Sequence, residues 1–298
     1  MGKDLAQQFP SARARFEEAD TLLGFSLSKL CWEGPLETLT RTAQCQPALY
    51  VTSLAALAGL ESELKDRNCP LSPASAAGLS LGEYTALAAA GAFSFEEGLR
   101  LVRLRGEAME EASRTFPGTM ASVLGLELKA LETICSETGA QVANINSPGQ
   151  IVISGSPEAV LAASARAKEK GAKRAVPLEV GGAFHSRLMA PAGARLKKAL
   201  ETVNVQSLGF SVLSNVTGSY YTDSNQAGAL LVAQLTSTVQ WEACVRTLLA
   251  DSVRTFLEVG SGTVLRGLVR RVDPEAQVLP VGTADEVRRA AAAVSQWS

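Results

Sequence analysis

The sequence predicts an α/β protein that has a mostly parallel sheet in its large domain and a ferredoxin-like subdomain inserted into that domain. Strand-like runs at 74–77, 210–217 and 254–259 alternate with helical stretches, an order that is typical of a parallel sheet. The stretch 119–178 instead follows the order β-α-β-β-α-β, which defines the ferredoxin-like unit. Gly-Leu-Ser-Leu-Gly at 78–82 matches G-x-S-x-G, the pattern of a strand-to-helix turn that exposes a serine.

The first 70 residues are predicted to be helical with loops. Residues 48–60, ALYVTSLAALAGL, are apolar on nearly all sides, which is typical of a helix buried in the core. Pro35 and Pro47 are expected to interrupt the helices, because proline lacks the N–H that a helix interior needs.

The next element is the turn around Ser80, with small residues before it and an alanine-rich helix after it up to Gly91. A sharp turn brings the flanking residues together, so we expect that a Cβ at either Gly78 or Gly82 would clash. A serine here faces the unpaired N–H groups at the start of a helix, where negative charge is stabilised. We therefore predict a nucleophile at Ser80, the alternative being a chance match in a chain rich in glycine and alanine.

A capping box at 94–97, Ser-Phe-Glu-Glu, predicts a helix that continues to about residue 112. Its core-facing stripe comprises Phe95, Leu99, Val102 and Met109. Arg105 lies on the flank of that stripe, and a partly buried guanidinium needs an anionic partner because it cannot lose its charge. That partner is either an internal Asp or Glu or the carboxylate of a substrate, which a guanidinium can hold in a two-pronged clamp.

The inserted subdomain occupies the middle of the chain. Its predicted elements are strands at 120–124, 141–144, 150–154 and 174–178, helices at 128–138 and 157–170, and a turn at 147–149. We therefore divide the chain into a large domain, 1–115 and 183–298, and an inserted subdomain, 116–182. Because the insert separates the serine from the histidine described next, we expect it to lie beside the site as a lid.

His185 is the single histidine of the chain. A lone histidine is more often a packed or surface residue than a catalyst, but this one follows two glycines at a predicted domain junction. With an ordinary pKa of about 6.5, its imidazole suits the removal of a proton from a serine hydroxyl, so we pair His185 with Ser80. The backbone N–H of Leu81 is the expected oxyanion donor. No Asp stands out as a partner of the imidazole, so we predict a dyad in which the histidine hydrogen-bonds a backbone carbonyl.

Composition argues against several other classes of protein. Lys+Arg 28 and Asp+Glu 30 give a net charge of −2, so no basic excess indicates nucleic acid. No apolar run reaches the roughly 20 residues of a membrane helix, and no signal-peptide segment is evident. The 5 scattered cysteines lack a C-x-x-C pair and are expected to be reduced thiols. We expect no metal, because the chain has one histidine and no Cys pair with ligand spacing. We expect no cofactor either, since GSGTVL at 260–265 lacks the third glycine of a dinucleotide loop and is interpreted as a strand-to-helix turn near the site.

Segments along nearly the whole chain occur in the same order as in malonyl-CoA:acyl-carrier-protein transacylases. They are GLSLGEYTAL, RLRGEAM, NINSPGQIVISG, GAKRAVPL, GAFHS, TVQWE and EVGSGTVL. The chain resembles this family, which implies an α/β-hydrolase-like large domain with a ferredoxin-like insert. The resemblance also implies a ping-pong reaction that supplies type II fatty-acid synthesis. Ser80 would take malonyl from malonyl-CoA, and the phosphopantetheine thiol of acyl carrier protein would then remove it.

The resemblance implies roles for particular residues. His185 matches the base in F-H-S, and Arg105, in R-G-E-A-M, matches the arginine that grips the malonyl carboxylate. Gln240, in V-Q-W, would orient His185 through its backbone carbonyl. Asn146 and Phe184 would line the site.

Other matches concern specificity and the partner protein. Leu81 and Phe184 resemble the malonyl-type choice at positions that limit an α-methyl branch. Lys173 and Arg174 match basic residues that meet the acidic carrier protein, the alternative being a solvated charged turn. The implied partners are malonyl-CoA and acyl carrier protein, with neither nucleic acid nor membrane.

The chain departs from the family pattern in two places. Leu79 replaces the histidine that is common before the nucleophile, as in some relatives. Family members also begin with a strand that ends in G-Q-G-x-Q, whose glutamine helps to form the oxyanion hole, whereas this sequence starts at Met1-Gly2-Lys3-Asp4. Loss of one oxyanion donor lowers turnover by roughly 10²–10³, and we expect a start codon assigned too far downstream.

Two other functions would use the same residues. A serine acyl hydrolase or thioesterase would pass the acyl group to water, since hydrolysis and acyl transfer share the dyad and the oxyanion donor. An inactive module that only binds carrier protein would fit a chain without the N-terminal strand. We also expect a monomer in the bacterial cytoplasm, or in the plastid stroma if the source is eukaryotic.

Overall fold

Helices make up the first part of the structure, which is a computed structural model that describes residues 1–297. They are α1 (Lys3–Gln8), α2 (Pro10–Leu23), α3 (Leu27–Glu33), α4 (Leu36–Thr40) and α5 (Thr42–Asp66). The expected core helix lies within α5, whose apolar residues pack into the main hydrophobic core. Pro47 also lies inside α5, so the predicted break there was wrong. The proline removes one main-chain hydrogen bond near the start of this long helix, and the burial of the helix outweighs that loss.

The predicted nucleophile lies between a very short strand and a helix. The elements of this region are β1 (Ser75–Ala76), α6 (Leu81–Ala89) and α7 (Phe95–Thr115). β1 is half-buried and has two residues, which is shorter than the strand-like run predicted at 74–77. The capping box at the start of α7 is confirmed, because Ser94 Oγ accepts the Glu97 N–H at 3.1 Å and the Glu97 carboxylate accepts the Ser94 N–H at 2.9 Å. α7 therefore begins where the sequence predicts.

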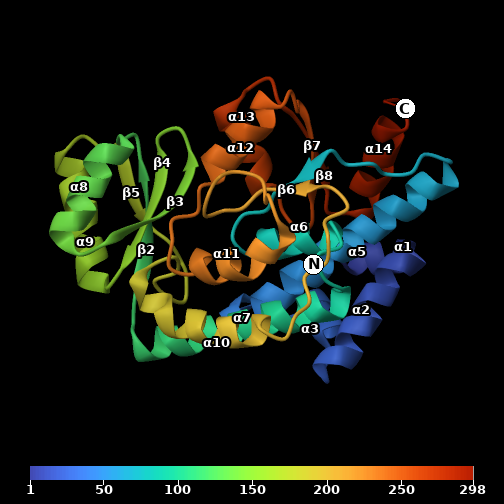
Figure 1. The fold of residues 1–298 in the computed structure, drawn as a ribbon, viewed down its shortest axis with the longest axis horizontal. Helices are drawn as coiled ribbons and strands as arrows, with labels where there is room; N and C mark the ends of the chain where they lie inside the picture. The colour runs from blue at the N-terminus through green and yellow to red at the C-terminus, as the bar shows by residue number, and fades with distance from the viewer. Residues whose placement is uncertain (298) are drawn as a thin grey trace.

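The middle of the chain forms a small subdomain at one end of the molecule (Figure 1). Its elements are β2 (Thr119–Leu124), α8 (Leu128–Thr138), β3 (Gln141–Ser147), β4 (Gln150–Gly155), α9 (Pro157–Glu169) and β5 (Arg174–Pro177). The strands form one antiparallel sheet in the order β3-β4-β2-β5, and α8 and α9 pack on it over a separate apolar core. The predicted β-α-β-β-α-β order is confirmed, and all six elements lie inside the expected insert, 116–182.

The insert is joined to the large domain along β3. Ile145 donates its N–H to Val239 O at 2.9 Å, and the Val239 N–H is donated to Ala143 O at 2.8 Å. The chain enters the insert near Gly118 and leaves it near Ala183. A Cβ added to Gly118 would lie 2.4 Å from the Ala183 Cβ, so these two connecting segments are in close contact. Ala183 is two residues before the predicted base, and the insert therefore lies beside the candidate site.

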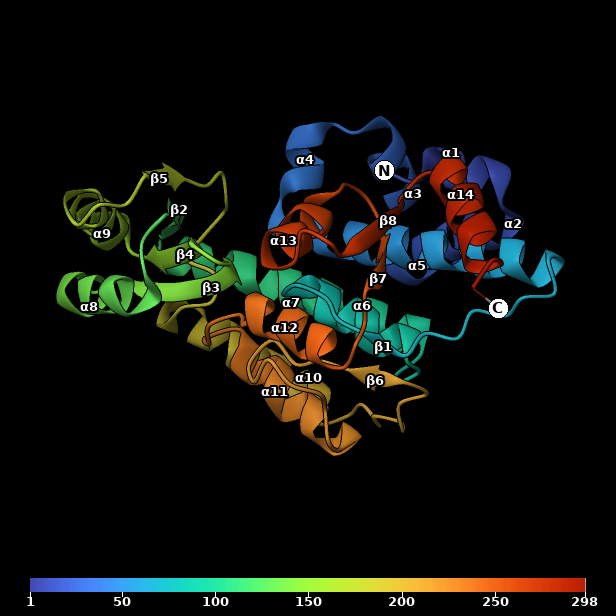
Figure 2. The same ribbon diagram turned by 90° about the horizontal axis from the view of Figure 1, so that it is seen from above.

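The parallel sheet of the large domain consists of two separate pairs of strands. β1 pairs with β6 (Ser211–Val212), and β7 (Thr255–Val259) pairs with β8 (Gln277–Val281), both in parallel. Figure 2 shows β7 and β8 close to α5, and β1 with β6 on the other side of α6. The strand predicted at 210–217 is much shorter, because the chain turns after Val212 and the Ser214 N–H is donated to Ser219 O. β8 was not anticipated, since its apolar run contains Pro280, a residue that usually argues against a paired strand.

The remaining helices surround these strands. They are α10 (Ala190–Leu200), α11 (Ala227–Gln234), α12 (Trp241–Ala250), α13 (Val264–Val272) and α14 (Ala284–Val294), with short 3₁₀ turns η1 (Arg187–Met189) and η2 (Ser224–Gln226). α14 lies beside α1 and α5 (Figure 1), where the Asp4 carboxylate accepts the Ala284 N–H at 2.7 Å. Across residues 1–297, no helix combines the length and the apolar character that a membrane crossing requires.

Candidate active site

Ser80 occupies a strained turn that glycine makes possible. Its φ of 52° and ψ of −98° lie outside the regions that a serine ordinarily adopts. A Cβ added to Gly78 would lie 2.0 Å from the backbone carbon and oxygen of Gly82, so a side chain at 78 cannot be accommodated. Nothing lies within 4 Å of a Cβ added to Gly82, so the expected clash there was wrong. Only the glycine before the nucleophile is required by space.

The side chain of Asn215 holds this turn in place. Its Oδ1 accepts the Ser80 N–H at 2.6 Å, and its Nδ2 donates to Gly78 O at 2.8 Å. One buried amide therefore satisfies backbone groups on both sides of the strained residue, which offsets part of the cost of the strain. Asn215 was not singled out from the sequence. The signal that could have found it is a buried polar side chain within the otherwise apolar run FSVLSNVT.

Ser80 and His185 are brought together as the sequence predicts. Their Oγ and Nε2 atoms are 2.8 Å apart, and His185 Nδ1 lies 2.8 Å from Gln234 O. A carbonyl can only accept, so Nδ1 carries the proton and Nε2 is free to accept the Ser80 hydroxyl proton. Burial lowers the pKa of His185 to about 4, and the charge of Arg105 contributes in the same direction. The imidazole is therefore neutral at neutral pH, which is the form that a general base requires.

The carbonyl that orients His185 belongs to Gln234, so the assignment of this role to Gln240 was wrong. Gln240 is the N-cap of α12, and its carbonyl accepts the Cys244 N–H at 3.0 Å. That carbonyl is committed to the first turn of the helix, whereas Gln234 lies at the end of α11, where carbonyl groups lack partners within the helix. The expected arrangement, a dyad supported by a backbone carbonyl, is present with a different residue.

Arg105 reaches Ser80 from α7 and is only 1% exposed. Its Nη1 donates to Gln46 Oε1 at 2.8 Å, and its Nη2 donates to Ser80 Oγ at 2.8 Å and to Gln234 Oε1 at 2.9 Å. All three acceptors are neutral, so the alternative that Arg105 pairs directly with an internal Asp or Glu is wrong. Burial lowers the pKa of the guanidinium, and the buried Nε has no hydrogen-bond partner among the described residues. A buried cation with neutral partners and a spare donor is suited to a carboxylate.

Two other predicted site residues, Leu81 and Phe184, are the sequence neighbours of Ser80 and His185. Leu81 is the first residue of α6, so its N–H is one of those that the helix itself leaves unpaired next to Ser80. Phe184 precedes His185 and packs against both the main core and the small-subdomain cluster of Met120, Ala143 and Val152.

Asn146 and the two basic residues lie in the small subdomain. Asn146 is buried in β3, and its Oδ1 has no hydrogen-bond partner within residues 1–297. Among these residues, no hydrogen bond joins Asn146 to Ser80, His185 or Arg105. Lys173 and Arg174 are exposed at the start of β5, which is the edge strand of the small sheet opposite to β3, the strand that contacts the large domain. No cluster of His, Cys, Asp or Glu side chains that could hold a metal ion occurs in the part of the chain that the structure describes.

The geometry allows an acyl group to be held at both of its ends. Ser80 Oγ can form an ester while the guanidinium of Arg105 binds a carboxylate carried by the same group. The fold and this site together define a serine-dependent acyl-transfer enzyme of the α/β class. The chain belongs to the acyl transferase domain family, whose sequence model matches residues 1–292.

Curated relatives agree with the resemblance seen in the sequence. The chain is 43% identical to the malonyl CoA-acyl carrier protein transacylase of Bacillus subtilis (strain 168) over 295 residues, which are 97% of this chain and 91% of that protein. It is 39% identical to the protein of the same name from Escherichia coli (strain K12), covering 90% of this chain and 87% of that one. The predicted family is therefore confirmed.

Solved structures agree with the fold. The acyl-carrier-protein-S-malonyltransferase of Bartonella henselae matches with a TM-score of 0.92 and 42% identity, over 99% of this chain and 94% of that chain. A malonyl-transacylase solved in complex with a type II polyketide acyl carrier protein matches with a TM-score of 0.92 and 36% identity, over 98% of this chain and 94% of that chain. The predicted fold class is confirmed as well.

Proposed function

We propose that this chain transfers a malonyl group from malonyl-CoA to the phosphopantetheine thiol of an acyl carrier protein, through a malonyl ester on Ser80. The observation that carries the proposal is Arg105, a buried guanidinium with only neutral partners that lies 2.8 Å from the nucleophilic oxygen. An acyl group that ends in a carboxylate can bond to the Ser80 oxygen through its carbonyl carbon and pair with the Arg105 guanidinium through its carboxylate. The names of the relatives, which are malonyl transacylases, support the same choice.

The first half-reaction loads the serine. His185 Nε2 takes the hydroxyl proton while Ser80 Oγ attacks the thioester carbonyl of malonyl-CoA. The Leu81 N–H stabilises the negative oxygen that forms. The carbon–sulfur bond then breaks, His185 returns the proton to the coenzyme A sulfur, and malonyl remains on Ser80 as an ester.

The second half-reaction runs the same chemistry in reverse on another thiol. The phosphopantetheine thiol gives its proton to His185, its sulfur attacks the ester carbonyl, and Ser80 regains its proton as malonyl leaves on the carrier. The two half-reactions share one site and one base, which gives a ping-pong scheme and needs no cofactor. Arg105 moves its hydrogen bond from Ser80 Oγ to the malonyl carboxylate in the first half-reaction and back to Ser80 Oγ when malonyl leaves in the second, and Gln234 keeps the imidazole aligned in both.

The other predicted residues complete the proposal. Asn146 and Phe184 line the space around the acyl group, and Phe184 with Leu81 limits an α-methyl branch. Lys173 and Arg174 meet the acidic surface of the carrier protein. We also propose a monomer that supplies fatty-acid synthesis, and the bacterial sources of the relatives favour the cytoplasm as its compartment.

Intact-mass measurement after mixing with malonyl-CoA tests the proposal. We expect the wild-type chain to gain one malonyl group and Ser80→Ala to gain none. Adding holo acyl carrier protein should discharge the adduct and load the carrier. An adduct that persists in Ser80→Ala would refute the assignment of the nucleophile. Rapid release of free malonate without a carrier would instead identify an acyl hydrolase.

A further inference from the structure

Glu83 is a buried carboxylate next to the site that the chemistry above does not use. It is 0% exposed and belongs to the first turn of α6. Its Oε1 accepts the Tyr221 hydroxyl, and its Oε2 accepts Gln234 Nε2 at 2.6 Å and the Asn215 N–H at 3.2 Å. None of these donors is a cation, and no ion pair involves Glu83 in the described part of the chain. A fully buried carboxyl group without a cation in contact either keeps a proton or is stabilised as an anion by a positive charge farther away.

The side chain of Gln234 links Glu83 to Arg105. Its Nε2 donates to Glu83 Oε2 at 2.6 Å and to Ser80 O at 2.9 Å, and its Oε1 accepts Arg105 Nη2 at 2.9 Å. The amide cannot be reversed, because its oxygen would then face two acceptors and its NH₂ would face the guanidinium. The series Arg105, Gln234, Glu83 therefore runs from a cation through one fixed amide to an anion.

A relayed pair differs from a direct ion pair in what it leaves free. If a carboxylate touched Arg105, it would occupy the donors that a substrate carboxylate needs. With the anion one amide away, the charge of Arg105 is partly compensated while its donors face only neutral groups that can be exchanged. Glu83 accepts three hydrogen bonds, which favours its ionised form, while burial raises its pKa to about 7.

We propose that Glu83 is the counter-charge of Arg105, held one amide away by Gln234, and that it moderates the affinity of Arg105 for the carboxylate of the acyl group. Glu83 is a positioning residue, because it acts through Gln234 and touches no substrate. The inference rests on the proposed function, in which Arg105 binds such a carboxylate. It predicts that removal of the negative charge strengthens carboxylate binding, which is the opposite of what simple loss of structure would cause.

Glu83→Gln removes the charge and keeps the shape. The amide oxygen can still accept from Gln234 and Asn215, and the new NH₂ can face the Tyr221 oxygen, which is able to accept. Binding is measured by calorimetry at pH 8 in a Ser80→Ala background, so that no acyl transfer occurs. The probes are malonyl-CoA and acetyl-CoA, and the ratio of their Kd values isolates the carboxylate.

We expect Glu83→Gln to tighten malonyl-CoA binding by about tenfold and to leave acetyl-CoA within twofold. Unit charges on the order of 10 Å apart, at an effective dielectric of about 20, produce an effect of this size. An unchanged ratio, or a selective weakening of malonyl-CoA, would overturn the inference. If Ser80→Ala itself binds malonyl-CoA no better than acetyl-CoA, it is the proposed role of Arg105 that fails.

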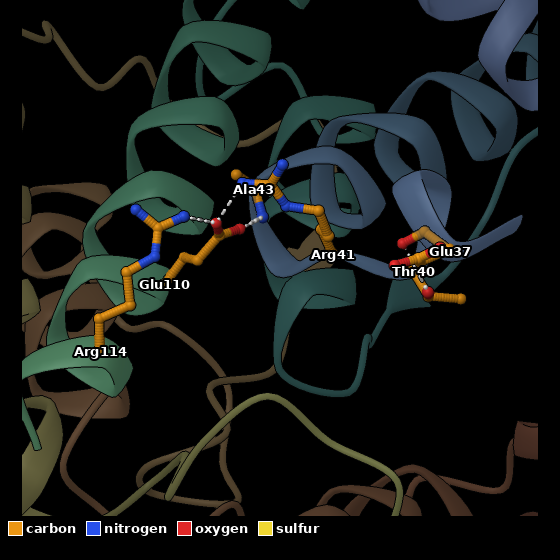
Figure 3. A network of polar contacts seen from close by, with 6 residues as sticks. All are labelled: Glu37, Thr40, Arg41, Ala43, Glu110 and Arg114. Carbon is orange, nitrogen blue, oxygen red and sulfur yellow. Dashed lines mark hydrogen bonds and ion pairs between the residues drawn. The ribbon is translucent and has the colours of Figure 1, made fainter. Parts of the chain in front are cut away.

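Glu110→Gln is the matched control. Glu110 lies on α7, the helix that carries Arg105, but its carboxylate is paired at the surface with Arg41 at 2.5 Å and with Arg114 (Figure 3). Its charge is compensated locally and screened by solvent. We expect the ratio of the two Kd values to stay within twofold, and a tenfold change would show that any lost carboxylate has the same effect.

A charge swap covers the case in which Glu83→Gln alone does not fold. Glu83→Gln combined with Gln234→Glu exchanges the carboxylate and the amide between the two positions. The net charge stays the same, but the carboxylate now lies beside Arg105. We expect malonyl-CoA binding to weaken at least tenfold and acetyl-CoA binding to stay within twofold. Equal malonyl-CoA affinity in the swapped and parent proteins would refute the inference.

Discussion

At the scale of single residues, Arg105 should decide which acyl group the enzyme accepts. Arg105→Ala removes the donor that pairs with the malonyl carboxylate, and an unpaired buried carboxylate is costly. Charge-assisted hydrogen bonds contribute about 1.5–3 kcal/mol, so kcat/KM for malonyl-CoA relative to acetyl-CoA should fall roughly 10- to 100-fold. Steady-state kinetics with both substrates measures this ratio. Arg103→Ala, a half-buried neighbour on the same helix that is paired with Glu107, serves as the control, and an unchanged ratio in Arg105→Ala would remove Arg105 from the site.

His185 should make folding depend on pH in a defined window. Its pKa is lowered to about 4 in the folded state, against about 6.5 in the unfolded chain. Between these two pKa values the unfolded chain binds more protons than the folded one. The contribution of His185 to the free energy of unfolding is therefore complete above about pH 6.5 and is lost as the pH falls towards 4. Glu83 acts in the opposite sense, since burial raises its pKa to about 7 and its contribution is lost as the pH rises.

The comparison of wild type with His185→Gln isolates the histidine. The difference between their unfolding free energies should decrease by roughly 1 kcal/mol per pH unit from pH 6.5 down to 4. Urea titrations at several pH values measure it. A difference that stays constant across this window would contradict the neutral, buried imidazole.

The candidate site shows which residues a sequence can reveal. Ser80, His185 and Arg105 carry distinctive side chains in ordered motifs, and the structure brings all three together. Gln234 was missed because it orients His185 through a main-chain carbonyl, a group that every residue has. Asn215 was missed because its two contacts join it to a turn far away in the sequence. Such roles depend on the fold and leave no local pattern.

At the scale of elements, the turn before α6 should respond unequally to its two glycines. Gly78→Ala places a Cβ 2.0 Å from backbone atoms of Gly82, so we expect a loss of at least about 3 kcal/mol of stability or failure to fold. Gly82→Ala meets nothing within 4 Å and lies inside α6, where alanine is favoured over glycine by up to about 1 kcal/mol. Thermal unfolding of both variants tests this. Equal destabilisation would contradict the geometry of the turn.

Elements were predictable where the signal is local. The capping box at 94–97 marks the start of α7 because its two hydrogen bonds join residues three positions apart. The helix expected at 128–138 is α8 with the same bounds. β8 and the short β6 depend instead on pairing with distant strands, so neither Pro280 nor the run at 210–217 indicated the observed extent. Tertiary pairing decides the length of such strands.

At the scale of the whole molecule, the small subdomain should influence transfer to the carrier protein and leave loading unaffected. Reversing the charges with Lys173→Glu and Arg174→Glu changes exposed residues at β5, the edge strand of the small sheet on the opposite side from β3. Electrostatic attraction to an acidic partner speeds association, so KM for acyl carrier protein should rise roughly tenfold at low salt and less at high salt. The rate of adduct formation from malonyl-CoA is the control. Unchanged KM would support the alternative of a solvated charged turn.

Ser80 Oγ contacts Arg105 of α7 and His185, and these two side chains are held in turn by Gln46 of α5 and Gln234 of α11, on both sides of the inserted subdomain. The hydroxyl therefore becomes reactive only when most of the polypeptide has reached its final arrangement. The fraction of molecules that become malonylated on Ser80 therefore measures the natively folded fraction of a sample. In a partly denatured or freshly refolded preparation, only molecules in which all of these segments have assembled are labelled.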